Sequence, residues 1–289
     1  MTDEITADLL RQWPLPQPGD GGKEERGQVL VVGGHAEIPG AVVLAATAAL
    51  RAGAGKLQVA TVEQIAAHLS LSVPEARAFA LKASNDGAIT AKSVKALVQH
   101  VARCKAVLVG PGTMDEGEAI ALELLAAESD AAFVLDAGAL PAAESGREFL
   151  AALDGRVVLT PHAGEMSQLT GRPKEEIEAD PLGAAQRAAK RYGAVAVMKG
   201  AATHIAAPDG QTWRYPGGGV GLGASGSGDV LGGLIAGLLA RGAGPAQAAA
   251  FGVYLHGEAG KVLARKIGPL GFLAREISAE VPGLMGELA

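Results

Sequence analysis

The stretch GASGSGDVLGG, Gly223–Gly233, places a single carboxylate, Asp229, behind glycine and serine and in front of an apolar series. That series recurs at helical spacing as Val230, Leu231, Leu234, Ile235, Leu238 and Leu239. The spacing predicts a helix with one buried face, which begins in the glycine run and carries the acid in its first turn.

A helix start leaves backbone N–H groups unpaired and carries a partial positive charge, and glycine lets a ligand approach that backbone closely. Such a turn suits a phosphate group. A carboxylate there would repel the phosphate unless it has another task, such as accepting the proton of an alcohol that attacks the phosphorus. The alternative is that Asp229 only caps the helix through its dipole.

Composition narrows the class of protein. With 289 residues, 48% of them hydrophobic and 3% aromatic, and with 41 glycines, the chain suits alanine-rich helices packed on a sheet. The net charge of −6 argues against nucleic acid or an anionic membrane as the main partner. The longest apolar runs, such as Ala41–Leu50, reach about half the length needed to span a bilayer.

The N-terminus, MTDEITADLL, is acidic where a secretory signal would be basic. Cys104 is the only cysteine, so an internal disulfide is impossible and a cysteine-based metal site is disfavoured. We therefore expect a cytoplasmic protein.

The order of patterns along the chain predicts one doubly wound domain. Residues 1–26 predict a short helix followed by a Pro- and Gly-rich linker, and residues 27–289 the domain. Short apolar runs are separated by predicted helices at 41–52, 62–69, 91–103, 117–127 and 181–192, which is typical of parallel strands joined by crossovers. THIAAPDGQTWRY then predicts a hairpin, and three helices close the chain.

Glycine or polar residues stop five of the apolar runs. In open parallel sheets, ligands bind beyond the carboxyl ends of the strands, so these stops predict a cleft. They are Gly33–His35, Gly110–Gly112, Asp136, Thr160–His162 and Lys199–Gly200.

Two apparent nucleotide motifs fail on spacing. VVGGHAEIPGA follows a strand, but His35 and Ile38 stand where a dinucleotide fingerprint needs its second and third glycines. GAGKL has Leu57 where a P-loop needs serine or threonine. A nicotinamide oxidoreductase of the usual kind and a P-loop enzyme are therefore disfavoured.

Three further segments carry candidate site residues. In TPHAGEM, His162 and Glu165 stand three apart at a predicted helix start, where His162 could contact a substrate and Glu165 a magnesium-bound water; the favoured alternative is a capping box. Lys199 ends a strand and could pair with phosphate, although a solvated lysine is the commoner case. His256, in YLHGEAG, fits a core or interface histidine.

Taken together, seven segments of the chain resemble the ADP- or ATP-dependent NAD(P)H-hydrate dehydratases, which are repair enzymes of the ribokinase superfamily. These segments are SGSGDVLGG, KGAATHI, LTPHAGEM, GPG, LDA, YLHGEAG and IPGAVVLAATAALRAGAG. The resemblance covers roughly residues 22–285. It implies a ribokinase-like three-layer α/β/α sandwich with a mostly parallel central sheet. It also implies a reaction on the S epimer of hydrated NADH or NADPH, in which the ring hydroxyl is phosphorylated and phosphate is then expelled. The resemblance implies ADP as the expected phosphoryl donor and Mg²⁺ as the metal ion.

By position, the resemblance implies that Asp229 is the base and that the Gly226 and Gly228 amides stabilise the phosphoryl group. Substrate contacts would come from Ala41, Gly112, His162 and Asp229. Contacts with the adenine nucleotide would come from Lys199, Gly200, Ala201, Ala202, Thr203 and Gly228. The chain departs from many relatives at Gly219, where asparagine is common, and at Glu276, where aspartate is common.

The resemblance further implies a homotetramer and a separate NAD(P)H-hydrate epimerase, because the first ~26 residues fall short of the roughly 50 of a small domain. Two rival functions remain open. A small-alcohol kinase of the hydroxyethylthiazole or sugar type would use Asp229 identically but is disfavoured by IPGA and TPHAGEM. A nucleotide sensor without turnover is disfavoured by the complete glycine turn with its acid.

Overall fold

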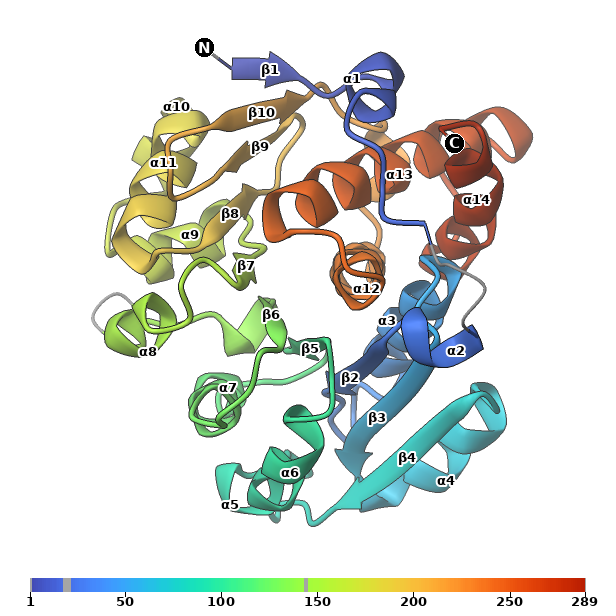
Figure 1. The fold of residues 1–289 in the computed structure, drawn as a ribbon, viewed down its shortest axis with the longest axis vertical. Helices are drawn as coiled ribbons and strands as arrows, with labels where there is room; N and C mark the ends of the chain where they lie inside the picture. The colour runs from blue at the N-terminus through green and yellow to red at the C-terminus, as the bar shows by residue number, and fades with distance from the viewer. Residues whose placement is uncertain (1, 18–21, 143–144, 289) are drawn as a thin grey trace.

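The computed structural model describes residues 2–17, 22–142 and 145–288, so part of the predicted linker lies outside the described residues. Within them, ten strands form one sheet in the order β1-β10-β9-β8-β7-β6-β5-β2-β3-β4 (Figure 1). The strands are β1 Thr2–Glu4, β2 Gln28–Val32, β3 Lys56–Val62, β4 Ala76–Leu81, β5 Ala106–Val109, β6 Ala132–Leu135, β7 Val157–Leu159, β8 Val195–Met198, β9 Thr203–Ala206 and β10 Thr212–Tyr215.

Most neighbouring strands are parallel, as the predicted crossovers require. Strands β2 to β8 pair only in parallel with one another, whereas β9 runs antiparallel to both β8 and β10. The predicted hairpin is therefore confirmed, and Gly210 supplies its turn with a φ of +94°. One edge thus differs in character from the rest of the sheet.

Helices cover both faces of the sheet, which makes three layers (Figure 1). Alternate residues of each strand point to opposite faces, so Val29 and Val31 pack in one core and Leu30 and Val32 in the other. The first face is covered mainly by α1 Ala7–Arg11, α3 Gly40–Arg51, α12 Ser227–Ala240, α13 Pro245–Lys266 and α14 Ala274–Gly286. The second is covered by α5 Ala91–Val94, α6 Val98–Val101, α7 Gly117–Leu125, α8 Arg147–Ala151, α9 Ala163–Thr170, α10 Lys174–Ala179 and α11 Pro181–Tyr192.

Helix α4 Glu63–Ser72 also packs on the first face, beside β3 and β4, where it buries Leu69. Helix α2 Gly22–Glu25 lies within the predicted linker and has no buried residue. The mostly parallel sheet between two helical layers confirms the predicted α/β/α sandwich.

Helices α3 and α12 approach each other at the level of the backbone. A methyl group added at Gly233 would overlap the carbonyl oxygen of Ala45, and one added at Gly237 would overlap that of Ala49. Because only glycine leaves room for this approach, the glycines of α12 are part of the packing. The closeness matters for the site, since both helices begin beside it.

Several elements differ from the sequence prediction, among them the unpredicted helices α2, α8 and α10. The helix expected over 91–103 is instead α5, a 3₁₀ turn at Lys95–Leu97 and α6. Strand β1 was not predicted; it pairs in parallel with β10, and the Ile5 N–H donates to the Arg214 carbonyl oxygen at 2.8 Å.

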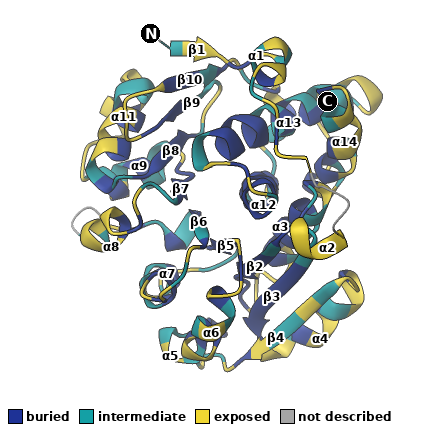
Figure 2. Ribbon diagram, in the orientation of Figure 1, coloured by how far each residue is buried: buried dark blue, intermediate teal, exposed yellow. Residues whose placement is uncertain are grey.

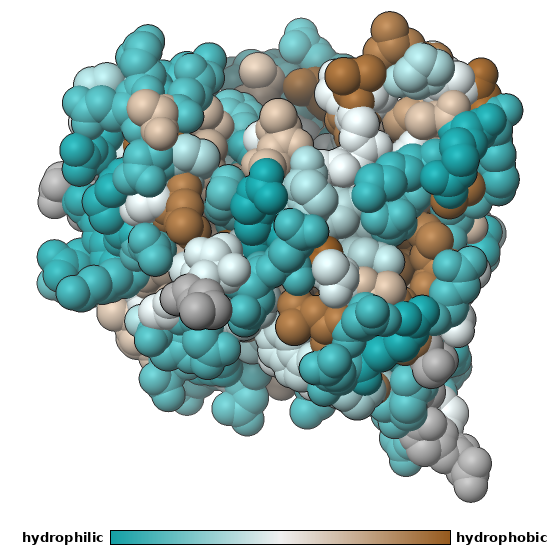
Figure 3. Space-filling view, turned by 90° about the horizontal axis from the view of Figure 1, so that it is seen from above, coloured by the Kyte–Doolittle hydropathy of each residue, from teal (hydrophilic) through white to brown (hydrophobic). Residues whose placement is uncertain are grey.

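Burial follows the layers: the central strands and α12 are dark in Figure 2, whereas the edge strands β1 and β4 are largely exposed or intermediate. The face in Figure 3 is largely hydrophilic, with apolar side chains in separate groups. No helix among the described residues has both the length and the apolar character to cross a membrane.

Candidate active site

The start of α12 has the form that the sequence predicted. Gly226 stands at the N-cap with a φ of +86°, a left-handed conformation that favours glycine, and Asp229 is the third helical residue. The Ser227 N–H donates to the Ala224 carbonyl and the Val230 N–H to the Gly226 carbonyl. The amides of Gly228 and Asp229 lie between them in the first turn, where a helix supplies no carbonyl partner. This turn can therefore donate hydrogen bonds to an anion.

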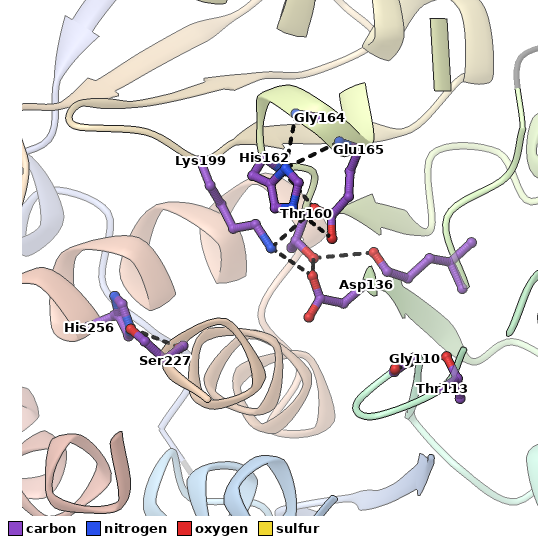
Figure 4. A network of polar contacts seen from close by, with 11 residues as sticks. Gly110, Thr113, Asp136, Thr160, His162, Gly164, Glu165, Lys199, Ser227 and His256 are labelled. Atoms are coloured by element: carbon purple, nitrogen blue, oxygen red, sulfur yellow. Dashed lines mark hydrogen bonds and ion pairs between the residues drawn. The ribbon is translucent and has the colours of Figure 1, made fainter. Parts of the chain in front are cut away.

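Lys199, at the end of β8, lies between two carboxylates (Figure 4). Its Nζ donates to Asp136 Oδ1 at 2.9 Å and lies 3.6 Å from Glu165 Oε2. Asp136, only 3% exposed, also accepts a hydrogen bond from the Thr160 hydroxyl at 2.7 Å. Burial disfavours the ammonium, but the two carboxylates outweigh it and raise the pKa of Lys199. The lysine is thus a partly buried cation held by two carboxylates rather than a solvated strand-end residue.

Asp229 has the pKa of a working base. Burial first, and then the charge of Asp136, raise its pKa to about 7, against the opposing attraction of Lys199. Asp136 lies beside the next turn of α12, where its Oδ2 would be 3.9 Å from a methyl group on Gly232. A general base is most effective when its pKa lies near the operating pH. A carboxylate whose role is to stabilise the helix N-terminus would be expected to have a lowered pKa, so the raised pKa favours the role of base.

A pocket of about 810 Å³ opens on one side of this turn. A volume of this size accommodates a nucleotide-sized ligand. Its wall includes most of the predicted nucleotide residues, but not Ala202. The residues that line it include Lys199, Gly200, Ala201, Thr203, Gly219, Ser227, Gly228 and His256.

The predicted substrate residues Ala41 and Gly112 meet on another side of the turn. A methyl group on Gly112 would lie 2.9 Å from Ala41 Cβ, and Ala41 is in the first turn of α3. A methyl group on Gly226 would lie 2.5 Å from Leu44 Cδ1, one turn further along α3. The start of α12 therefore lines the 810 Å³ pocket and packs against α3 one turn from Ala41, with Asp229 in the same turn.

For Glu165 and His162 the structure confirms the capping alternative. The His162 N–H donates to Glu165 Oε2 at 2.7 Å, and His162 Nδ1 accepts from the N–H groups of Gly164 and Glu165. His162 also lines the nucleotide pocket. Capping does not occupy Glu165 fully, since it also lies beside Lys199.

The residues present suit magnesium only in a particular way. Among the described residues, no three His, Cys, Asp or Glu side chains are grouped so as to hold a metal ion. Mg²⁺ usually keeps several waters and binds through one or two carboxylates plus substrate phosphates. The site therefore fits an ion that nucleotide phosphates bring with them, with Glu165 and Asp136 nearby, and does not fit a protein cage.

Sequence reasoning missed or misplaced several residues of this site. His256 lies on the pocket wall and contacts Ser227, so the prediction of a core or interface histidine did not include its position at the pocket. Asp136 was recognised only as the end of a strand. Of the two departures, Gly219 lines the pocket, whereas Glu276 accepts from the Leu273 N–H at 2.6 Å and caps α14. The spacing of Val253, His256 and Gly257 on one helical face was the available signal for a pocket wall.

Comparisons with known proteins agree with this geometry. The family model described as NAD(P)H-hydrate dehydratase matches residues 29–283. An ADP-dependent (S)-NAD(P)H-hydrate dehydratase of Xanthomonas campestris is 48% identical over 98% of this chain and 96% of its own length. A bifunctional NAD(P)H-hydrate repair enzyme of Moorella thermoacetica is 37% identical over 98% of this chain, which spans 54% of that longer relative.

A solved structure extends the match to the fold. The ADP/ATP-dependent NAD(P)H-hydrate dehydratase of Bacillus subtilis, co-crystallised with ATP and Mg²⁺, superposes with a TM-score of 0.84 at 29% identity. The superposition covers 100% of this chain and 99% of the other. The ribokinase-like fold class is thereby confirmed. On the family match, the identity over nearly the whole chain and the shared fold, this chain belongs to the NAD(P)H-hydrate dehydratase family.

Proposed function

We propose that this protein restores hydrated NADH or NADPH, in the S epimer, by transferring a phosphoryl group to the ring hydroxyl and then expelling phosphate. ADP is the expected donor, so the other products are AMP and NAD(P)H. The observation that carries the proposal is Asp229, a partly buried carboxylate whose pKa is raised to about 7, in the first turn of a glycine-flanked helix. The 48% identity to the Xanthomonas relative supports the choice of substrate.

The first step uses the two sides of the α12 turn. The nucleotide lies in the 810 Å³ pocket with its phosphates toward Lys199 and Gly228, and the hydrated ring lies toward Ala41 and Gly112. Asp229 accepts the hydroxyl proton as the hydroxyl oxygen bonds to phosphorus and the donor's phosphorus–oxygen bond breaks. The Gly226 and Gly228 amides and the Lys199 ammonium stabilise the charge of the phosphoryl group during transfer.

The second step needs little from the protein. The ring nitrogen donates its electron pair as the carbon–oxygen bond to phosphate breaks, and a proton leaves the neighbouring ring carbon. The ring double bond of NAD(P)H forms again, and inorganic phosphate is released. Bound with the nucleotide, Mg²⁺ would neutralise phosphate oxygens, with Glu165 as the predicted contact through water.

The remaining proposals concern context. We propose a homotetramer, consistent with exposed apolar side chains at Val220, Ile267, Leu270 and Leu273. We also propose a cytoplasmic location, which the single buried Cys104 supports. Interconversion of the hydrate epimers is proposed to belong to a separate epimerase.

One assay tests the function. Purified protein receives hydrated NADH, Mg²⁺ and either ADP or ATP, and dihydronicotinamide absorbance and inorganic phosphate are followed together. We expect absorbance to return with one phosphate released per nucleotide consumed, faster with ADP than with ATP. A lasting phosphate ester of a small alcohol would identify a kinase, and tight nucleotide binding without any turnover would identify a sensor.

A further inference from the structure

Ser227 and His256 meet on the wall of the nucleotide pocket (Figure 4). Ser227 is the first residue of α12 and only 4% exposed, and His256 projects from α13. Both line the same pocket as Lys199 and Gly228. Neither residue has a role in the mechanism described above.

The hydrogen bonds between the two residues fix where the protons are. His256 Nε2 lies 3.0 Å from the Ser227 carbonyl oxygen and 2.9 Å from the Ser227 Oγ. A carbonyl oxygen can only accept a hydrogen bond, so Nε2 must carry a hydrogen. The hydroxyl oxygen then faces that N–H and accepts from it. Since a hydroxyl has one hydrogen of its own, the Ser227 O–H remains available to donate elsewhere.

The charge state of the ring agrees with this assignment. Burial lowers the pKa of His256 to about 4, with a smaller contribution from the Lys199 charge and an opposing one from the Ser227 carbonyl. The ring is therefore neutral near pH 7, with a single N–H. That hydrogen is the one on Nε2, which the two Ser227 oxygens share.

Further hydrogen-bond donors line the same pocket as the Ser227 hydroxyl. The Gly228 amide is in the same helical turn, and a methyl group on Gly228 would lie 3.6 Å from Lys199 Nζ. The Lys199 ammonium keeps its two carboxylate partners, but it still brings positive charge to this pocket, where helix-start amides and the Ser227 hydroxyl hydrogen are available to donate. An anion would be attracted by that charge and would accept from those donors. In a nucleotide, that anion is the phosphate chain.

We propose that the Ser227 hydroxyl donates a hydrogen bond to a phosphate oxygen of the bound nucleotide, and that His256 is the positioning residue that turns the hydroxyl hydrogen toward it. This inference rests on the proposed function for the identity of the ligand. It makes the Ser227 side chain a phosphate contact, in addition to the backbone amides of the glycine turn. It also gives the histidine of YLHGEAG a task that packing alone would not require.

The test compares a ligand that has phosphates with one that lacks them. Titration calorimetry measures the affinity of ADP and of adenosine for the wild-type protein, Ser227→Ala, His256→Leu and His256→Gln. We expect Ser227→Ala to weaken ADP binding about 10- to 100-fold, as for the loss of a hydrogen bond to a charged group, and to leave adenosine affinity unchanged. The Ser227 carbonyl stays in place in this variant, so the His256 ring keeps a partner.

The His256 variants test the positioning role. His256→Leu should weaken ADP binding to a similar degree, whereas His256→Gln, which keeps an N–H donor, should retain most of the affinity. The double variant Ser227→Ala with His256→Leu should bind ADP no more weakly than Ser227→Ala alone, because the histidine acts through the hydroxyl.

Three results would overturn the inference: unchanged ADP affinity in Ser227→Ala, an equal loss of adenosine affinity, or additive losses in the double variant. Urea unfolding of each variant confirms that the folded protein is being titrated. Turnover of the wild-type protein with hydrated NADH is measured separately. A wild-type protein that binds ADP but does not regenerate NADH would refute the proposed function and leave the Ser227 titration a valid test of the phosphate contact.

Discussion

Replacing Asp229 by asparagine should stabilise the protein and inactivate it. The pKa of Asp229 rises from an ordinary 3.8 to about 7 in the folded protein. Below pH ~3.8 the carboxyl group is protonated in both the folded and the unfolded state, so it has no effect on the free energy of unfolding. As pH rises toward 7, the unfolded state ionises first, and the folded state is progressively destabilised relative to it.

The size of this effect follows from the shift. One pKa unit corresponds to about 1.4 kcal/mol, so the penalty is about 1.5 kcal/mol near pH 5 and at most about 4 kcal/mol near pH 8. Asparagine resembles the protonated acid and avoids the penalty. We therefore expect Asp229→Asn to have a higher free energy of unfolding than the wild type at both pH values. This stabilisation should be larger at about pH 8 than at about pH 5, and the two should differ by roughly 2 to 3 kcal/mol.

The assay is urea unfolding of both proteins at the two pH values, with turnover and ADP affinity measured on the same samples. Turnover should fall by about 10²- to 10⁴-fold, because a general base is lost, while ADP affinity stays equal or becomes tighter. A stability difference that does not change with pH would refute the assigned burial of the charge. Near-normal turnover would refute the assignment of Asp229 as the base.

The other predictions concern the neighbours of Asp229. In the wild type, kcat/KM should rise with pH through about 7, because the base must be ionised. Asp136→Asn should move this rise to lower pH, because the charge that repels the Asp229 carboxylate is lost. A pH–rate profile whose midpoint does not move would contradict the coupling between the two residues. Glu165→Gln retains a carbonyl oxygen for the cap, so it should raise the magnesium requirement more than the substrate requirement, and an unchanged magnesium titration would leave Glu165 with capping alone. Gly228→Ala should fold normally, since the added methyl makes only ordinary contacts, but should weaken ADP binding by blocking the backbone. Gly226→Ala, at a φ of +86°, is the matched comparison and should lower the free energy of unfolding by about 1 to 2 kcal/mol, which urea titration of both variants would detect.

The sequence predicted the site where local patterns were sufficient. The apolar spacing after Asp229 predicted α12 correctly, and the stops at strand ends predicted the edge where Asp136, Thr160 and Lys199 meet. The pKa of Asp229 could not be predicted, because it depends first on burial in the folded chain and then on the charge of Asp136. Asp136 is 93 positions away in the sequence, and only the strand order brings it near.

Other misses have different physical causes. Strand β1 has only three residues and no alternation of apolar side chains; its partner β10 is about 210 positions away, so local pattern gave no signal. The broken helix over 91–103 buries Val94, Leu97 and Val101, and a spacing of three followed by four suits a 3₁₀ turn as well as an α-helix. In both cases tertiary contacts decided between local structures that the sequence left nearly equal.

The close approach of α3 and α12 fixes the distance between the two predicted ligand sites. Helix α3 starts at the Ala41–Gly112 contact, α12 starts at the phosphate turn, and backbone atoms touch along their length at Gly233 and Gly237. A spacing set by main-chain atoms cannot be adjusted by turning a side chain. In the proposed reaction, the scaffold would therefore set the separation between hydroxyl and phosphorus before either ligand binds. Acceptance of a different alcohol in this fold would therefore require changes in the loops, because a wider spacing would require the backbones of α3 and α12 to separate in the core.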